Sequence, residues 1–226
     1  AFALQVAEEG GLPFLALGRR KADQARELLQ EASKLLAARS WGVSLLGLAS
    51  SEARPEHVAA VEESCPPYAI VDARQPQLAS SLEGKGIATY LKVASPEALP
   101  ALLAGGARRF IFEGLECGGV VGPLSSFALW EQAIQKLADA KLSADEASQI
   151  HVLLSGGVHD RRSAAMVAAL AQPLIELGMK VGLLLGTPYL FTEEFVSTGA
   201  IVPGFQEEAL QADHTVLLKT DDEHGM

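Results

Sequence analysis

Short apolar runs alternate with longer helical patterns along most of the chain, and this alternation constrains the fold more than any other feature of the sequence. The apolar runs span residues 12–17, 41–48, 68–72, 87–93, 109–113, 150–155 and 181–186. Each run has the length of a strand and is mostly apolar rather than alternating, which is typical of a strand buried on both faces. Helical patterns fill the intervals, over residues 21–38, 56–63, 75–83, 95–104, 125–140 and 160–177. Strict β–α alternation predicts a parallel sheet with crossover helices.

The number of runs favours a (β/α)8 barrel of the TIM type over a doubly wound open sheet. A helical pattern over residues 1–9 precedes the first run, so a further strand is expected upstream and would bring the total to eight. Polar and glycine-rich motifs follow successive late runs, and a barrel gathers all such loops on one face. We therefore expect one α/β barrel domain over residues 1–220, with its first strand missing, and a polar tail over residues 221–226. Because the chain begins at Ala1 rather than at Met, we interpret it as a piece of a longer protein.

The composition disfavours several classes of protein. The formal net charge of -10 and the lack of a run of Lys or Arg argue against a nucleic-acid-binding surface. Two cysteines, Cys65 and Cys117, do not make a disulfide framework, so we expect a reducing compartment, the cytoplasm. No apolar run reaches the ~18–20 residues that a membrane span needs, and no signal peptide is recognisable. We therefore expect neither a nucleic acid nor a membrane as a partner.

Two glycine-rich motifs end the last two apolar runs. They are Ser155-Gly156-Gly157, before a helical pattern with Asp160 as its expected N-cap, and Gly186-Thr187, before a helix expected near residues 192–194. Bare backbone N–H groups at adjacent helix N-termini favour a phosphate, and barrels frequently bind phosphate after their last two strands. The alternative is that both motifs are tight turns that need glycine anyway. The tandem arrangement favours the phosphate site.

A third glycine-rich stretch, GLECGGVVGP over residues 114–123, follows the run that ends at Glu113. One interpretation is a backbone wall against a flat ligand, with Glu113 and Glu116 available for hydrogen bonds. The other is an ordinary loop. No histidine or basic residue lies within this loop to lower the pKa of Cys117, so we expect its thiol to be unreactive.

Among the remaining polar residues, Lys92 stands out because it lies at the carboxyl end of an apolar run. It is placed to form a Schiff base or to contact an anionic or electron-rich ligand, and a salt bridge at the rim is an equally supported alternative. His159 follows the Ser-Gly-Gly turn, so it is a candidate to face the same site. His151 begins a strand and is expected to be structural. The other histidines are expected at the surface or in the tail: His57, His214 and His224. No histidine pair has the spacing of a zinc site.

In order along the chain, these motifs resemble the nitronate monooxygenase family, formerly called 2-nitropropane dioxygenases, which includes flavin-dependent enoyl-acyl carrier protein reductases. The motifs are Gly10-Gly11-Leu12, Lys92, Glu113-Gly114-x-Glu116-Cys117-Gly118-Gly119, Ser155-Gly156-Gly157 and Gly186-Thr187. Three further stretches, at 122–131, 186–194 and 205–210, resemble a branch embedded in large polyketide and polyunsaturated fatty-acid synthases. That branch would account for a chain that begins without Met.

The resemblance implies a TIM-type barrel with FMN at the carboxyl ends of the strands. The residues that would hold the FMN phosphate are Ser155, Gly156, Gly157, Gly186 and Thr187. The residues that would contact the isoalloxazine ring and ribityl chain are Ser44, Lys92, Glu113, Gly118 and Gly119. The resemblance also implies NADPH or NADH as electron donor, an acyl thioester or carrier-protein-bound substrate, and other synthase domains as partners. The flavin would carry the redox chemistry while the protein positions it.

The chain departs from the family at two places. The Gly-Pro-Met type segment of the family's first strand does not occur before Ala1, and Val120 stands where members usually have an acid–base histidine. Valine can neither take nor give a proton, so Tyr189, water or, by conjecture, His159 would have to serve. We expect an active FMN oxidoreductase, with a catalytically degraded FMN-binding or scaffold barrel as the alternative. A phosphate-substrate isomerase or a Lys92 Schiff-base aldolase is a third hypothesis, which the ordered set of motifs disfavours.

Overall fold

The computed structural model describes residues 1–18, 20–47, 53–117, 122–214 and 216. The chain divides into two compact units, Ala1–Leu91 and Lys92–Met226, and each is described by itself. The boundary falls within one strand, β4 (Ala88–Val93). Lys92, the candidate site residue on that strand, is therefore the first residue of the second unit.

The first unit alternates helices with parallel strands. Its elements are α1 (Phe2–Glu8), β1 (Phe14–Ala16), α2 (Ala22–Leu35), β2 (Gly42–Ser44), α3 (Pro55–Ser64), β3 (Tyr68–Asp72), α4 (Pro76–Gly84) and most of β4. β2 pairs in parallel with both β1 and β3, so that Phe14, Gly42 and Tyr68 share one register position. A Cβ at Gly42 would lie 2.4 Å from the Phe14 ring and 2.9 Å from Tyr68 Cβ. This register therefore requires a glycine between the two aromatic residues.

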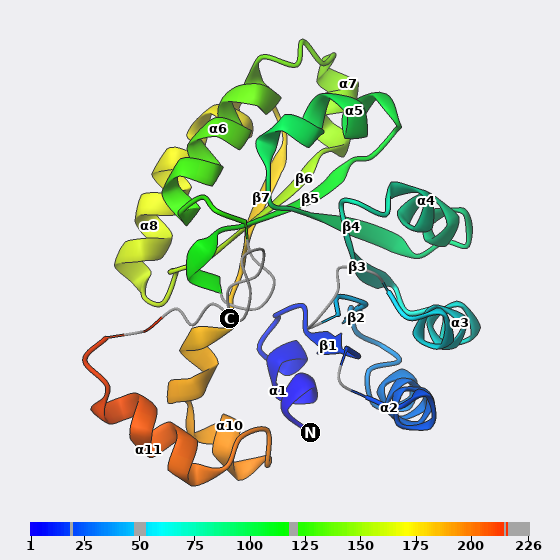
Figure 1. Ribbon diagram of the computed structural model, residues 1–226, viewed down its shortest axis with the longest axis vertical. Coiled ribbons are helices and arrows are strands. Elements are labelled where there is room, and N and C mark those ends of the chain that lie inside the picture. Colours follow the sequence, from blue (N-terminus) through cyan, green and yellow to red (C-terminus); the bar gives the residue numbers. More distant parts are fainter. Residues whose placement is uncertain (19, 48–52, 118–121, 215, 217–226) are drawn as a thin grey trace. The chain divides into compact units, whose positions relative to one another are not determined.

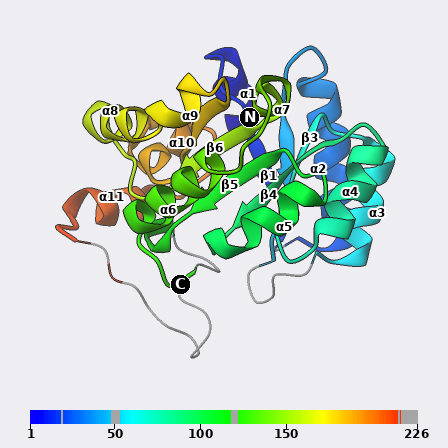
Figure 2. The same ribbon diagram turned by 90° about the horizontal axis from the view of Figure 1, so that it is seen from above.

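The helices of the first unit cover one side of its strands, as Figure 1 and Figure 2 show for α2, α3 and α4. α2 buries Ala25, Leu29 and Ala32, which recur at the spacing of one helix face. α3 buries His57 together with Ala60 and Val61. His57 is only 1% exposed, and its Nε2 lies 3.0 Å from the carbonyl oxygen of Arg20. The expectation that His57 lies at the surface is therefore wrong, because its position on the buried face of α3 outweighs its polarity.

The second unit continues the alternation. Its elements are η1 (Pro96–Ala98), α5 (Leu99–Ala104), β5 (Arg109–Glu113), η2 (Leu115–Cys117), α6 (Ser126–Ala138), α7 (Ala144–Gln149), β6 (His151–Ser155), α8 (Arg161–Leu170), α9 (Gln172–Glu176), β7 (Lys180–Leu184), η3 (Thr187–Phe191), α10 (Glu193–Ser197) and α11 (Pro203–Gln211). β6 pairs in parallel with β5 and β7. Glu113 pairs with Ser155, and Ser155 with Leu184, so these three strands end at the same level.

α6 anchors the core of this unit against β5. It buries an apolar stripe that consists of Leu129, Trp130, Ala133, Ile134 and Leu137. The indole Nε1 of Trp130 donates a hydrogen bond of 3.1 Å to the carbonyl oxygen of Phe112. Phe112 is fully buried on β5. The helix is thereby tied by both packing and a directional bond to the strand that ends at Glu113.

Two expected helices differ from the structure. The pattern over residues 160–177 forms α8 and α9 rather than one helix, because Pro173 lacks an N–H group and is tolerated only in the first turn of a helix. α7 was not expected, although it carries a capping-box signal: Ser143 and Glu146 bond each other's backbone and side chains. Short helices of this kind lie below the length at which periodicity is a reliable signal.

The strand order confirms a TIM-type barrel fold. In the part of the chain that the structure describes, seven strands follow the sequence order from β1 to β7 in the sheet, whereas a doubly wound sheet reverses its order at a switch point. This is one strand fewer than the eight of a closed (β/α)8 barrel. The last strand, β7, is partly exposed from Val181 to Leu184, while the centre of β5 is buried. Among the described residues, no helix has both the length and the apolar character that crossing a bilayer requires.

Candidate functional site

In the second unit, polar side chains gather where the strands end. β4 ends just after Lys92, β5 ends at Glu113 and β6 ends at Ser155. The carboxyl ends of parallel strands are the edge at which α/β folds bind ligands. Loop residues that follow β5 and β6 add Glu116, Cys117 and two glycine turns to this edge. The described part of the predicted site is therefore built on rigid strands.

Lys92 and Glu113 form an ion pair between Nζ and the carboxylate. The Lys92 side chain is 8% exposed and the Glu113 side chain 17%, so both charges lie largely out of water. Of the two interpretations of Lys92, a salt bridge and a ligand contact, the structure shows the salt bridge, and it is buried rather than at the rim. Burying two charges is expensive unless they are paired and hydrogen-bonded. Two paired charges, both largely shielded from water, therefore lie at the edge where α/β folds bind ligands.

Glu116 is hydrogen-bonded to the start of α6. Its Oε2 accepts hydrogen bonds from the backbone N–H of Ser126 at 2.7 Å and from the Ser126 hydroxyl at 2.5 Å. Ser126 is the first residue of α6 and is 3% exposed. The Glu116 carboxylate thus satisfies donors at a helix N-terminus. Oε2 of Glu116 is therefore bonded within the protein, while the residue itself is exposed, so its availability to a ligand stays a prediction.

Cys117 lies against β6. Its Sγ is 3.2 Å from the hydroxyl oxygen of Ser155, which in turn donates to the carbonyl oxygen of Leu184 at 3.0 Å. Burial, and secondly the negative charge of Glu113, raise the pKa of the Cys117 thiol to about 12. Because the thiolate is the reactive form of cysteine, this environment supports the expectation of an unreactive thiol.

The glycines of the two predicted phosphate motifs have different reasons to be glycine. Gly156 has φ +120°, and a Cβ there would lie 1.9 Å from the Ser126 hydroxyl oxygen. Gly157 has φ +70°, which also favours glycine. Gly186 has an ordinary φ of -129°, and a Cβ there would meet nothing within 4 Å. The described protein therefore requires glycine at 156 and 157, but nothing in it requires glycine at 186.

The residues of these motifs also differ in exposure. Ser155 and Gly156 are buried, and the Ser155 hydroxyl is already bonded within the protein. Gly157, Gly186 and Thr187 are exposed. Gly157 and Gly186 each follow the paired residues Ser155 and Leu184 by two positions, so they leave adjacent strands at the same level. The exposed backbone at the ends of β6 and β7 therefore comes from these residues.

Both helix N-termini that were expected near these motifs occur in the structure. Asp160 is the N-cap of α8, as predicted, and its Oδ1 accepts the Ser163 N–H at 2.8 Å. A carboxylate of the chain itself therefore lies at this N-terminus. After β7 the chain first forms the short 3-10 helix η3, which begins at Thr187, and α10 begins only at Glu193. Asp160 already complements the dipole of α8. The exposed backbone at the ends of β6 and β7, rather than this helix N-terminus, is therefore the candidate contact for a phosphate.

The remaining candidates belong to other elements or lie outside the described residues. His159 is exposed, and its Nδ1 lies 2.8 Å from the carbonyl oxygen of Gly157. Tyr189 is half-buried within η3. Ser44 ends β2 in the first unit, where it pairs with Ile70. Gly118, Gly119 and Val120 lie outside the described residues. In the described ranges, no group of three His, Cys, Asp or Glu side chains is placed to hold a metal ion.

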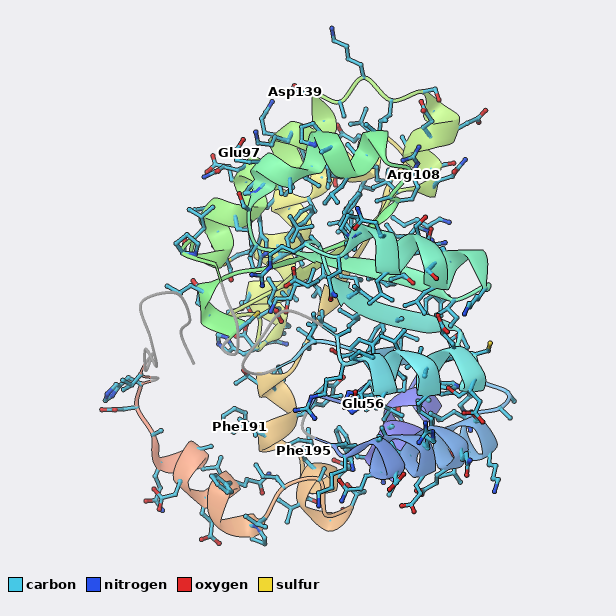
Figure 3. The ribbon with its side chains drawn as sticks, turned by 45° about the vertical axis from the view of Figure 1, so that its right-hand side comes forward. Glu56, Glu97, Arg108, Asp139, Phe191 and Phe195 are labelled. Atoms are coloured by element: carbon cyan, nitrogen blue, oxygen red, sulfur yellow. The ribbon has the colours of Figure 1, made fainter. Side chains whose placement is uncertain are left out.

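A hollow of about 530 Å³ lies elsewhere in this unit, between α5, α6 and α7. Its lining includes Leu103, Arg108 and Asp139. Figure 3 shows Arg108 and Asp139 at the end of the unit where β5 begins. This is the opposite end of the strand from Glu113. The hollow is therefore not the predicted site, and Arg108 there is bonded to the carbonyl oxygens of Leu103 and Ala107.

One residue of the cluster, Ser126, was not among the predicted site residues. Its backbone would be only 2.3 Å from a Cβ at Gly114, and its hydroxyl blocks a Cβ at Gly156. Ser126 therefore lies tightly between the turns that follow β5 and β6. Ser125 is the N-cap of α6, and its hydroxyl accepts the Ala128 N–H at 3.4 Å. The neighbouring serine is the one that connects the site.

Strand order, parallel pairing and a polar cluster at the carboxyl ends define a protein with a TIM-type (β/α) barrel fold. No protein-family model and no curated protein matches the sequence. Among solved structures, the chain is similar to FabK from Thermotoga maritima, with a TM-score of 0.75 and 24% identity over 99% of this chain and 65% of FabK. It is also similar to nitroalkane oxidase from Streptomyces ansochromogenes, with a TM-score of 0.62 and 22% identity over 85% of this chain and 62% of the oxidase.

A third similar structure is native KDPGal, with a TM-score of 0.53 and 18% identity over 93% of this chain and 89% of that one. At these identities the similarity shows the fold. The chain spans less than two thirds of the length of FabK and of the nitroalkane oxidase.

Proposed function

We propose that the chain is an FMN-dependent oxidoreductase domain of the enoyl-thioester reductase or nitronate monooxygenase type, belonging to a polyketide or fatty-acid synthase. The observation that carries the proposal is the pair of exposed glycines at the ends of β6 and β7. Gly186 in particular is glycine without a conformational or packing reason in the described protein. A phosphate bound against the backbone would explain a glycine at 186, since a side chain there would occupy the space of the phosphate.

Two further observations support this proposal. The order of motifs along the chain resembles the nitronate monooxygenase family, and the fold is similar to those of FabK and a nitroalkane oxidase. The residues present also fit the cofactor chemically. Exposed backbone at Gly157 and Gly186 and the hydroxyl of Thr187 suit a phosphate. The Lys92–Glu113 pair would lie beside the isoalloxazine ring, with Gly118 and Gly119 along the ring and ribityl chain.

When bound, FMN would supply the two-electron chemistry, and the chain would position it and exclude water. Ser155 and Gly156 do not face solvent, so their role would be to fix the turn that presents Gly157. The Lys92 ammonium offers a hydrogen-bond donor and a positive charge at the carboxyl end of β4. The substrate class we infer is an acyl thioester, free or attached to a carrier protein. NADPH or NADH would be the electron donor.

Reduction of an enoyl thioester also needs a proton at the α-carbon. At the position where the resembled family usually has a histidine for this step, the chain has Val120. Val120 has no titratable group. The Tyr189 hydroxyl or a water molecule is the proton donor that we propose. His159 is less suited, because its Nδ1 is bonded to the carbonyl oxygen of its own turn.

Val120 also favours a second candidate function, a barrel that has lost its chemistry and serves as a scaffold or FMN-binding domain within a synthase. The two candidates share the cofactor site but differ in turnover. They can therefore be separated by measuring binding and catalysis independently.

The visible spectrum of the purified full chain tests the cofactor. An absorbance band near ~450 nm, released as FMN on heating, is the expected result. A colourless protein that takes up no added FMN would rule out the oxidoreductase and leave a scaffold barrel without a cofactor. For a yellow protein, anaerobic NADPH should bleach the band, and a crotonyl thioester, as the electron acceptor, should restore it. Bleaching without substrate-dependent recovery would leave the degraded barrel as the function.

A further inference from the structure

We propose that Glu116 is a positioning residue, whose carboxylate fastens the stem of the glycine loop onto α6 and thereby sets the wall of the cofactor site. The stem is residues 114–117 and 122–124, the described parts of the loop on either side of residues 118–121. The link to a cofactor rests on the proposed function, but the fastening itself does not.

The stem is closed at its base by the protein's own contacts. The Leu115 N–H donates to the carbonyl oxygen of Leu124 at 2.9 Å, which brings the two ends of the loop together. Gly122 packs so closely that a Cβ there would lie 2.7 Å from the carbonyl oxygen of Ala94. These contacts fix where the loop begins and ends, but none of them joins it to a helix.

Glu116 supplies that connection. Its Oε2 accepts from both the backbone N–H and the hydroxyl of Ser126, ten residues along the chain. α6 runs beside β5 in Figure 1 and Figure 2, and Trp130 ties it to Phe112. A carboxylate bonded to the first residue of α6 therefore connects the loop to a helix that is itself packed on and bonded to β5.

The same contact orders the neighbouring turn. The Ser126 hydroxyl donates to Glu116, and its oxygen occupies the space that a Cβ at Gly156 would need. The hydroxyl also lies 3.4 Å from the carbonyl oxygen of Ser155. Ser126 thus touches both glycine turns, and Glu116 fixes the rotamer of Ser126. Glu116 is therefore connected, through Ser126, to both glycine turns of the proposed site.

The chain contains a matched control. At α7, Glu146 Oε2 accepts from the N–H of Ser143 at 2.9 Å and from its hydroxyl at 2.8 Å. This is the same pattern of a glutamate on the N–H and hydroxyl of one serine, but Glu146 lies three residues from its partner and closes only a helix turn. Glu116→Gln and Glu146→Gln remove the same charge from the same kind of contact, one at the site and one far along the chain from it.

The experiment compares the full chain, E116Q and E146Q by hydrogen–deuterium exchange and by FMN titration. We expect E116Q to speed the exchange of residues 114–117 and 126 and to weaken FMN binding about tenfold or more, since a charge-assisted hydrogen bond is lost. E146Q should leave FMN affinity and the exchange of residues 114–117 and 126 at wild-type values and speed exchange only at residues 143–147. Ser126→Ala, which keeps the N–H donor, should give an intermediate result and serves if E116Q does not fold.

The outcomes separate the two proposals. If the wild-type chain binds no FMN, the proposed function fails while exchange still tests the fastening. Wild-type exchange over the stem in E116Q, or in S126A if that variant is used, would overturn the fastening. A loosened stem with unchanged FMN affinity would overturn the positioning role. An equal loss of FMN affinity in E146Q would show a general effect on stability and would also overturn it.

Discussion

Lys92, near the end of β4, and Glu113, at the end of β5, form an ion pair whose side chains are 8% and 17% exposed. A lysine and a glutamate at the ends of successive strands would ordinarily be solvated. Here they are paired where the fold places its binding edge. A buried pair contributes little net stability, yet removing one partner leaves an unpaired buried charge. The pair should therefore behave very differently in single and double variants.

We predict that Lys92→Met lowers the free energy of unfolding by roughly 2–4 kcal/mol, because it leaves the Glu113 charge without its partner. Adding Glu113→Gln should restore part of that loss. Urea denaturation of both single variants and of the double variant measures the coupling between them. The control is Lys136→Met, which breaks the pair with Glu97 (Figure 3), where the side chains are 33% and 73% exposed. That change should cost at most about 1 kcal/mol, and an equally small cost for Lys92→Met would contradict burial of the site pair.

Gly156 and Gly186 should respond in opposite ways to alanine. Gly156→Ala forces a Cβ to within 1.9 Å of the Ser126 hydroxyl at φ +120°, and we expect a loss of about 2–4 kcal/mol or a failure to fold. Gly186→Ala meets open space at an ordinary φ, so stability should change by less than about 0.5 kcal/mol. FMN affinity should nevertheless fall in Gly186→Ala. Thermal denaturation and FMN titration measure the two effects.

Gly84→Ala is the control for the second variant, since Gly84 also faces open space but ends α4 in the first unit. It should change neither FMN affinity nor the fold. Unchanged FMN affinity in Gly186→Ala would remove the observation on which the proposed cofactor site depends.

Much of the fold could be predicted from the sequence because parallel strands buried on both faces are continuous apolar runs. The runs at 68–72 and 109–113 match β3 and β5 residue for residue. The first two runs are at least twice as long as β1 and β2, because apolar residues continue beyond the hydrogen-bonded ladder. Pro173 should have divided the helical pattern at 160–177, since proline is tolerated only in the first turn.

The site could be predicted less well, for a physical reason. Sequence spacing indicates which residues follow a strand, and this correctly placed Lys92, Glu113 and Ser155 at one edge. It does not indicate which polar groups are already hydrogen-bonded within the protein. Glu116 bonds to a serine ten residues away across a loop, and Gly156 is glycine because Ser126 occupies its side-chain space. Both depend on how α6 packs against the strand ends, which no local pattern encodes.

Cys117 should be nearly inert at neutral pH. With a pKa of about 12, its thiolate fraction at pH 8 is only about one in ten thousand. Iodoacetamide should therefore modify the exposed Cys65 and spare Cys117 in the folded chain, as mass spectrometry of the peptides would show. In denaturant both should react. Rapid modification of folded Cys117 at pH 8 would contradict its burial.

The same shift predicts a dependence of stability on pH. An unfolded cysteine titrates near about pH 8.5, whereas folded Cys117 keeps its proton to about pH 12. Between these values the folded state binds more protons than the unfolded state, so stability falls as pH rises. Its contribution is fully present below about pH 8.5. Cys117→Ala should flatten this part of the stability profile relative to wild type, and Cys65→Ala should not.

Val120→His tests whether the chain lacks only its proton donor. If FMN is bound and the site is otherwise intact, an imidazole at the position where the family resemblance has histidine should raise enoyl-thioester reduction by about 10²–10⁴-fold, the usual range for a general acid or base. The rate should follow a pH profile with a pKa near that of histidine, about 6.5. The adjacent Val121→His adds the same group one residue away and should not raise the rate. No gain in Val120→His, with FMN still bound, would contradict a site that is complete but for this residue and would favour the scaffold function.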